Sequence, residues 1–129
     1  MTDNERTPMP ETTLTPSEMS DLERQARIRD LNDHLRRHAH GGVWRVTTGI
    51  AGVQPEKTRQ ILKAVASFTD FNTDNDPWGE HDCAVMEVAG ERIIWKIDYY
   101  DRSQTYLSPD PANPKVTLRV LTVMLAHEY

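Results

Sequence analysis

The sequence predicts an α+β domain in which helices pack on one face of a small, mostly antiparallel sheet of about three strands. Residues 55–68 have the apolar spacing of an amphipathic helix. Two β-branched runs joined by Ala89-Gly90 have the pattern of a hairpin. A length of 129 residues and a mass of 14.8 kDa fit one compact core. The expected order is helix, strand, helix, loop, hairpin, helix.

The first 14 residues are polar and contain Pro8 and Pro10, so we expect a disordered tail ahead of a single domain over residues 15–129. A capping box at Thr15-Pro16-Ser17-Glu18 predicts the start of a helix that ends at Gly41-Gly42.

That helix carries two apolar stripes. Ile28 and Leu35 share one face, whereas Leu22 and Ala26 project about 150° away. One straight helix cannot bury both stripes in one core. Either the helix breaks near residues 24–27, or residues 15–26 form a separate or swapped segment that contacts another surface, including a second chain.

The middle of the chain alternates between regular elements and a turn-rich loop. Val43 to Thr48 reads as a strand, and Pro55 opens a helix whose buried face is expected to include Ile61 and Val65. Residues 70–81 show no periodicity and are rich in Asn, Asp, Pro and Gly, which predicts a loop.

The hairpin pairs residues 83–88 with residues 92–100, and Gly90 is suited to the positive φ of the turn. In its second strand the core face should comprise Ile93, Trp95, Ile97 and Tyr99. A proline-rich loop over residues 108–114 is followed by a predicted helix from Pro114 to the end of the chain, with Arg119 on its polar stripe.

Composition limits the classes of protein to which this chain can belong. A hydrophobic content of 37% with a mean hydropathy of −0.67 excludes a membrane protein, and a net charge of −5 disfavours a histone-like coating of nucleic acid. Cys83 is the single cysteine, which excludes an internal disulfide and favours a cytoplasmic protein. We find no secretion signal at the start of the chain.

Charge is unevenly distributed along the chain. Residues 24–63 hold nine Lys and Arg against three acids, a net +6, whereas residues 70–91 hold seven acids and no Lys or Arg, a net −7. The acidic segment could attract a metal ion or a basic protein surface, and the basic segment could attract an anion such as nucleic acid. The alternative is that both are solvated faces with internal ion pairs.

Three groups of residues have side chains that could bind a metal ion. Asp70, Asn72 and Asp74 have the first spacings of a calcium loop, but the glycine and the final glutamate of that loop are missing. His34 with His38, and His81 with Cys83, could supply zinc ligands, although the adjacent glutamate of a metalloprotease helix is absent. We expect no cofactor, with Mg²⁺ or Ca²⁺ as the alternative.

A catalytic site would need the carboxylates of the loop and the hairpin to converge. Two or three carboxylates beside a lysine or histidine can hold Mg²⁺ and activate water. The candidates are Asp76, Glu80, His81, Asp82 and Asp98. Ser103, Ser108 and Cys83 carry no sequence signature of an activated nucleophile.

Three motifs in order carry a family resemblance: NDPWGEHD at residues 75–82, WKIDYYD at residues 95–101 and SPDP at residues 108–111. With the predicted terminal helix from Thr117 to Tyr129, residues 27–129 resemble a family of short bacterial proteins known only as a domain of unknown function. Its members are common in alphaproteobacteria and their plasmids or phages. The resemblance implies no reaction, but suggests a mobile-element accessory protein that binds a host defence or regulatory protein.

The favoured hypothesis is a non-catalytic interaction protein. Its expected contact residues are Trp78, Glu80, His81, Lys96, Asp98, Tyr100 and Asp101. A metal-dependent hydrolase or nuclease is the alternative, and a nucleic-acid binder that uses residues 24–63 is the third. A homodimer through the N-terminal or the C-terminal helix is a further expectation.

Overall fold

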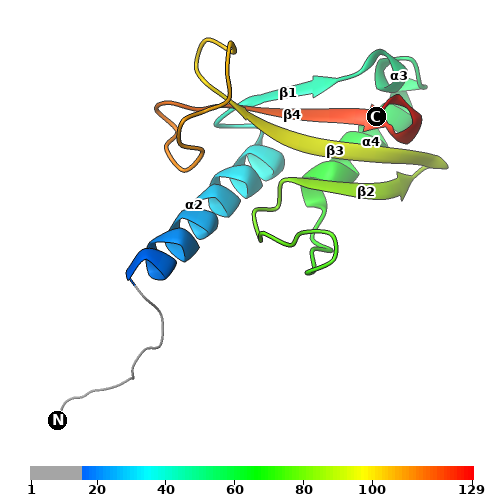
Figure 1. The fold of residues 1–129 in the computed structure, drawn as a ribbon. Coiled ribbons are helices and arrows are strands. Elements are labelled where there is room, and N and C mark those ends of the chain that lie inside the picture. The colour runs from blue at the N-terminus through cyan, green and yellow to red at the C-terminus, as the bar shows by residue number, and fades with distance from the viewer. Residues whose placement is uncertain (1–15) are drawn as a thin grey trace.

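The computed structural model describes residues 16–129. Within this range, three α-helices, four strands and a short 3₁₀ helix follow one another in sequence (Figure 1). They are α2 (Pro16–His38), β1 (Val43–Val46), α3 (Thr48–Ala51), α4 (Pro55–Ser67), β2 (Cys83–Val88), β3 (Glu91–Tyr100), β4 (Leu118–Leu125) and η1 (Ala126–Glu128).

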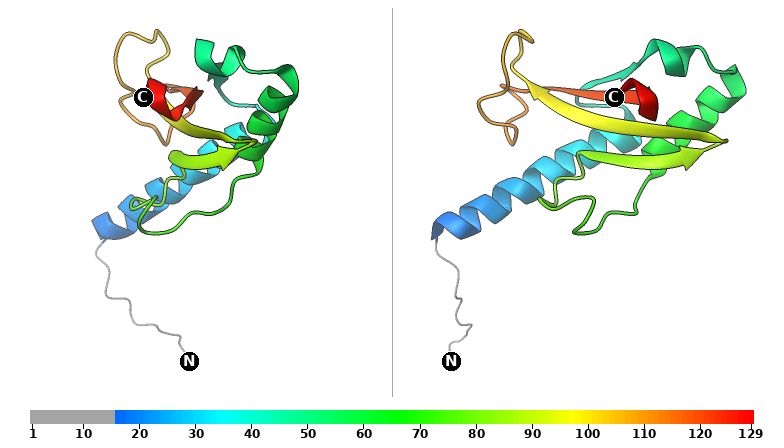
Figure 2. Two further views of the ribbon diagram at one scale, coloured as in Figure 1. Left: turned by 90° about the vertical axis from the view of Figure 1, so that its right-hand side faces the viewer. Right: turned by 45° about the vertical axis from the view of Figure 1, so that its right-hand side comes forward.

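The strands form one sheet in the order β1-β4-β3-β2. β1 runs parallel to β4, and the other two neighbouring pairs are antiparallel. α2 and α4 lie on the same face of this sheet (Figures 1 and 2). The predicted α+β class is therefore confirmed, with a fourth strand beyond the expected three.

The fourth strand corrects the prediction of a C-terminal helix. Residues 118–125 form β4, which is paired with β1 on one side and β3 on the other, and only residues 126–128 are helical. A strand that is paired on both edges and covered on both faces has a nearly continuous run of apolar residues in its sequence. The sequence of a buried helix has the same pattern, so periodicity does not distinguish the two. The long C-terminal helix that was expected as a dimer contact is thus replaced by an interior strand.

The first helix excludes one of the two alternatives for its apolar stripes, a break near residues 24–27. α2 continues without a break through residues 24–27. Arg24 donates to Asp110 Oδ1 at 2.9 Å and Arg27 donates to the carbonyl of Ala112 at 3.3 Å, so this part of the helix is attached to the loop after β3. Leu22, on the second stripe, is 51% exposed. Thr15 and the expected tail over residues 1–14 lie outside the described residues.

The core fills the space between the sheet and the two longer helices. Its fully buried side chains include Leu35 from α2, Ile61 and Val65 from α4, and Trp95 from β3. The expected core face of β3 is confirmed, because Ile93, Trp95 and Ile97 are at most 5% exposed and Tyr99 packs against the same core. No helix of residues 16–129 is long and apolar enough to cross a membrane.

Two sequence signals for chain reversal are confirmed. Ala89 and Gly90 both have positive φ, 54° and 82°, as a type I′ hairpin turn requires. α2 ends at His38 ahead of Gly42, whose backbone passes directly against β4. A Cβ at Gly42 would stand 2.6 Å from the carbonyl oxygen of Arg119 and 2.9 Å from Leu35.

We therefore predict that Gly42→Ala lowers the free energy of unfolding by about 1–3 kcal/mol, because backbone and core atoms would have to move. Thermal denaturation measures this as a decrease of roughly 4 °C in Tm per kcal/mol. Gly52→Ala is the matched control: its φ is −85° and the nearest atom is 3.2 Å from the new Cβ. Equal losses in the two variants would contradict the close approach of Gly42 to β4.

Candidate functional site

The acidic loop, residues 70–82, is organised around one buried carboxylate. Asp76 is 7% exposed, and its side chain accepts hydrogen bonds from the backbone N–H groups of Glu80 and His81 at 3.1 and 3.2 Å. The backbone N–H of Asp76 in turn donates to the carbonyl of Asn72 at 2.9 Å. Asp76 therefore holds the second half of the loop in a fixed turn.

His81 attaches the acidic loop to α2. Its Nδ1 lies 2.9 Å from Asp33 Oδ1, and its Nε2 lies 3.6 Å from Asp76 Oδ2. The imidazole stacks on Phe71 with ring centroids 3.8 Å apart and planes inclined by 5°. The loop thus presents His81 to a carboxylate on each side and to an aromatic ring on one face.

A second set of contacts, the Asn32 network, consists of Asn32, Glu80, Tyr99 and Arg119. Asn32 has no exposed surface; its amide donates to Tyr99 Oη at 2.8 Å and to the carbonyl of Glu80 at 3.0 Å. Its Oδ1 accepts from Arg119 Nε at 2.8 Å, and Tyr99 donates to Glu80 Oε1 at 2.9 Å. The network joins α2, the acidic loop, β3 and β4, and burial lowers the pKa of Arg119 and raises that of Tyr99.

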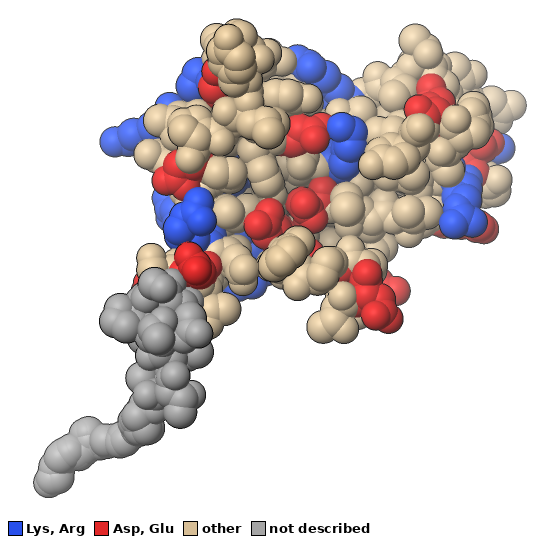
Figure 3. Space-filling model, viewed as in Figure 1, with Lys and Arg blue, Asp and Glu red and all other residues tan. Residues whose placement is uncertain are grey.

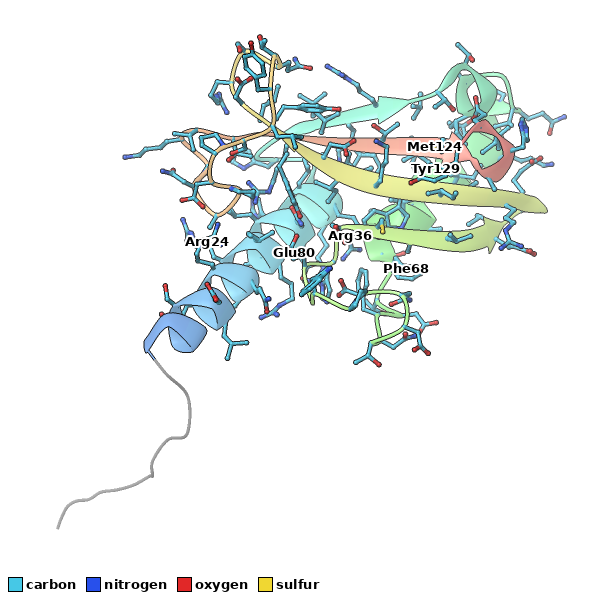
Figure 4. All side chains as sticks on the ribbon, in the orientation of Figure 1. Arg24, Arg36, Phe68, Glu80, Met124 and Tyr129 are labelled. Carbon is cyan, nitrogen blue, oxygen red and sulfur yellow. The ribbon has the colours of Figure 1, made fainter. Side chains whose placement is uncertain are left out.

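Arg36 joins α2 to the end of α4. It is 1% exposed and donates to the carbonyls of Phe68 at 2.7 Å and Ala66 at 3.1 Å, where α4 leaves its last carbonyls without helical partners (Figure 4). Asp33 accepts from the same guanidinium at 2.9 Å. Burial lowers the pKa of Arg36, and the neighbouring Asp33 opposes that shift.

The other face of the sheet carries a hollow of about 450 Å³ beside β2 and β3. We refer to it as the outer hollow. Its lining residues are Asn75, Asp82, Cys83, Ala84, Val85, Ile94, Lys96, Ile97, Asp98 and Tyr129, the last of which is labelled in Figure 4. Apolar side chains and a few charged groups share this surface, as is common in binding sites.

The charged groups of the outer hollow differ in their partners. Lys96 Nζ lies 2.5 Å from Asp98 Oδ2, and this contact raises the pKa of Lys96. Burial, then the charges of Glu80, Asp76 and Asp98, raises the pKa of Asp82. Burial likewise raises the pKa of the Cys83 thiol, with Asp82 adding to the shift, so this thiol is less nucleophilic than an ordinary one at neutral pH.

The five catalytic candidates fall into two groups. Asp76, Glu80 and His81 are bonded within the acidic loop or to α2 and β3, whereas Asp82 and Asp98 line the outer hollow. Within residues 16–129 no three His, Cys, Asp or Glu side chains are placed to hold a metal ion together. The described residues thus place the five candidates at two separate locations.

The calcium candidates lie on a loop that closes on itself. Asn72 Oδ1 accepts from the backbone N–H groups of Asp74 and Asn75, and Asn75 Nδ2 donates to the carbonyl of Asp70 at 2.8 Å. These bonds occupy Asn72 Oδ1, one of the three candidate ligands, and the backbone carbonyl of Asp70. Of the zinc candidates, His34 bonds His40 at 3.2 Å, while His81 faces Asp33 and Cys83 lines the outer hollow.

The predicted contact residues are similarly divided. Trp78 is 71% exposed, and Lys96 and Asp98 line the outer hollow. Tyr100 follows on β3, and Asp101 accepts from Ser103 Oγ and the N–H of Thr105, which closes the turn after β3. Glu80 and His81 face α2 instead.

Most of the basic segment is engaged inside the chain. Besides Arg24, Arg27 and Arg36, described above, the structure pairs Arg29 with Gly79 O, Arg45 with Gln104, Lys57 with Glu91 and Arg59 with Glu56. The carboxylate partners of Arg24, Arg36, Lys57 and Arg59 offset part of the charge of residues 24–63, in agreement with the alternative of internal ion pairs. The other three arginines donate to neutral oxygens and keep their full charge.

Sequence reasoning missed the three buried polar anchors, Asn32, Arg36 and Arg119. A signal was available for Asn32 and Arg36, because both continue the stripe of Ile28 and Leu35 at helical spacing. A polar residue on an apolar stripe indicates a buried hydrogen-bonding partner. Arg119 gave no such signal, because the expected helix placed it on a solvated stripe.

We predict that Asn32→Ala lowers the free energy of unfolding by about 2–4 kcal/mol, because it removes the hydrogen-bond partner of Arg119 Nε and of the Glu80 carbonyl and one of the two partners of Tyr99 Oη. Tyr99→Phe should cost about 1 kcal/mol. Urea denaturation of both variants and of the double variant gives their coupling energy. Strictly additive losses would contradict the shared network.

A second prediction concerns pH. Because the folded pKa of Asp82 is raised, the native state binds its proton more tightly than the unfolded state, for which the pKa is about 3.9. This group therefore costs stability increasingly as the pH rises through the window between the two pKa values. Asp82→Asn should therefore raise Tm at pH 7. Because Asp82 is half-exposed, the gain in the free energy of unfolding should be less than about 1 kcal/mol. Below pH about 3.5 the substitution should leave Tm unchanged. An equal gain at both pH values would contradict the assignment.

The comparisons with known proteins identify the family without adding a function. The model of a family described as a protein of unknown function, DUF3768, matches residues 46–128. No curated protein and no solved structure matches the chain. The match begins later than the expected residue 27, so all of α2 lies outside it. Since the match covers more than half of the 129 residues, the chain belongs to the DUF3768 family of unknown function.

Proposed function

We propose that this chain is a non-catalytic protein-interaction module whose contact surface is the outer hollow together with Trp78. The single observation that carries this proposal is that α2 and α4 cover one face of the sheet only (Figure 2), while the other face has a hollow lined by apolar and charged side chains. Exposed apolar surface of this kind typically marks an interaction site.

The apolar part of the surface is substantial. Val85 is 52% exposed and lines the outer hollow with Ile94, and Trp78, on the acidic loop, is 71% exposed. Large aromatic side chains are frequent anchors of protein interfaces. The acidic loop is held by Asp76 and His81, so the partner would meet a preformed surface at a small cost in ordering.

Charge indicates the chemistry of the partner. Of the seven acids of residues 70–91, Asp76 is buried, Glu80 accepts from Tyr99 and Glu91 pairs with Lys57. The surface charge is therefore carried by Asp70, Asp74, Asp82 and Glu87, and Figure 3 shows acidic side chains gathered over the loop below β2. Lys96, at the outer hollow, is neutralised by Asp98. A basic protein surface therefore complements this face better than an acidic one.

The chemistry of the outer hollow favours binding over catalysis. Lys96 is paired and carries a raised pKa, and the Cys83 thiol has a raised pKa as well, so neither is activated as a base or nucleophile. A mobile-element accessory protein that binds a host defence or regulatory protein, as the family resemblance suggests, is compatible with such a surface.

The proposal is tested by selecting random twelve-residue peptides, displayed on phage, against the full chain. We expect the selected peptides to combine Lys or Arg with apolar residues and to bind more weakly as salt increases. Asp82→Lys and Val85→Glu should each weaken binding about tenfold or more, which corresponds to about 1.4 kcal/mol. Lys115→Glu, on the exposed loop before β4, is the control with unchanged affinity. No enriched peptide, or affinities that both surface variants leave unchanged, would contradict the proposal.

A further inference from the structure

We infer that the partner binds as an extended strand added to the free edge of β2, with Lys or Arg side chains directed at the acidic groups of this edge. The inference rests on the proposed function and specifies how a partner would be held. It follows from the hydrogen-bonding geometry of β2, from what covers its edge, and from the local charge.

The direction of each backbone group of β2 is determined by its pairing with β3. Ile97 N–H donates to Asp82 O at 2.7 Å, and the register then places Ala84, Met86 and Val88 as the residues whose N–H and C=O groups point to β3. The alternate residues, Cys83, Val85 and Glu87, direct their N–H and C=O groups away from the sheet. β2 therefore offers three donors and three acceptors in the spacing that an added strand requires.

Nothing within residues 16–129 satisfies these groups. β2 is the last strand of the sheet, and no hydrogen bond from a described backbone or side chain reaches the outward groups of Cys83, Val85 or Glu87. The acidic loop reaches the outer hollow through Asn75 but forms no strand beside β2 (Figure 1). Three residues with both backbone groups unpaired make this edge available to another chain.

The sequence of β2 also lacks the usual protection of an edge. Natural edge strands carry lysine, proline or a bulge that discourages pairing. The segment CAVMEV has no lysine and no proline, and all six residues pair with β3 in an uninterrupted register. The opposite edge, β1, is four residues long and carries Arg45, which donates to Gln104 at 3.0 Å. The edge of β2 is therefore the one suited to strand addition.

Side-chain chemistry indicates which strand would fit. Cys83, Val85 and Glu87 are exposed on the same face as the outer hollow, with Val85 in the middle and acids on either side, at Asp82 and Glu87. An added strand would place one apolar or β-branched side chain beside Val85 and basic side chains beside the acids. A second copy fits less well, because antiparallel pairing centred on Val85 would bring Glu87 of each copy towards Asp82 of the other, between chains of net charge −5.

The test uses Val85→Pro, with peptides taken from the phage selection as probes. The Val85 N–H points away from β3, so proline there removes an outward donor without removing a bond of the sheet. We expect the affinity to fall about tenfold or more, while Val85→Thr, which keeps the N–H, loses less than about threefold. Glu87→Lys should also weaken binding of the basic peptides.

A second arm of the test leaves the protein unchanged. Peptides N-methylated at alternate residues keep their side chains but cannot donate on one edge, so one of the two methylation patterns should abolish binding and the other should not. This arm applies even if Val85→Pro does not fold. If the selected peptides bind equally with either methylation pattern, the inference of strand addition is wrong, whereas the proposal of an interaction surface at the outer hollow is retained. If no peptide is selected, the proposed function itself fails.

A third measurement decides between partners. Analytical ultracentrifugation measures the mass of the full chain and of the Val85→Pro variant in solution. The two masses should be equal if the edge of β2 binds a different protein. A dimer that Val85→Pro dissociates would overturn the assignment, because it would identify a second copy of this chain as the added strand.

Discussion

The amide of Asn32 is the contact on which the arrangement of the molecule depends. It is fully buried, and its oxygen and nitrogen are shared between Arg119 on β4, Tyr99 on β3 and the backbone of Glu80 in the acidic loop. Without this amide, the guanidinium of Arg119 would be buried with an unsatisfied Nε, at a cost of several kcal/mol. A helix, a loop and two strands thus meet at one side chain.

This contact also determines which face of the sheet is left open. Asn32 and Asp33 draw Glu80 and His81 of the acidic loop towards α2, on the covered face of the sheet. Asn75 and Asp82 of the same loop line the outer hollow, but the loop forms no strand beside β2, so the edge of β2 stays unpaired within residues 16–129. The same buried polar contacts that stabilise the fold therefore create the surface on which the proposed function relies.

Local patterns predicted the parts of the fold that depend on local chemistry. Ala89-Gly90 was sufficient for the hairpin turn, and alternation in β3 was sufficient for its core face, because both follow from backbone geometry and period-two burial. β4 could not be predicted in this way. Five of its eight residues are buried, and the strand forms by pairing with β1 and β3, which are distant in sequence. An apolar run of that length has no periodicity that separates strand from helix.

The sequence was sufficient to name residues of the candidate site, but not to predict how they are arranged in space. Charge counting located the acidic loop, and the hairpin pattern placed Lys96 and Asp98 on its open face. The sequence could not show that His81 turns to Asp33 while Asp82 turns to the outer hollow, because this depends on α2, which is distant along the chain. Arg119 shows the same limit, since its burial follows from the unpredicted strand β4.

Amide hydrogen exchange, measured residue by residue by NMR, tests the central claim that the loop is held at α2 and that the edge of β2 is free. The account predicts slow exchange at Ala84, Met86 and Val88, whose N–H groups bond β3, and fast exchange at Cys83, Val85 and Glu87. It also predicts protection at Glu80 and His81, whose N–H groups bond Asp76, with loss of that protection in Asn32→Ala. Uniform protection along β2, or fast exchange at Glu80 and His81 in the unaltered protein, would contradict the account.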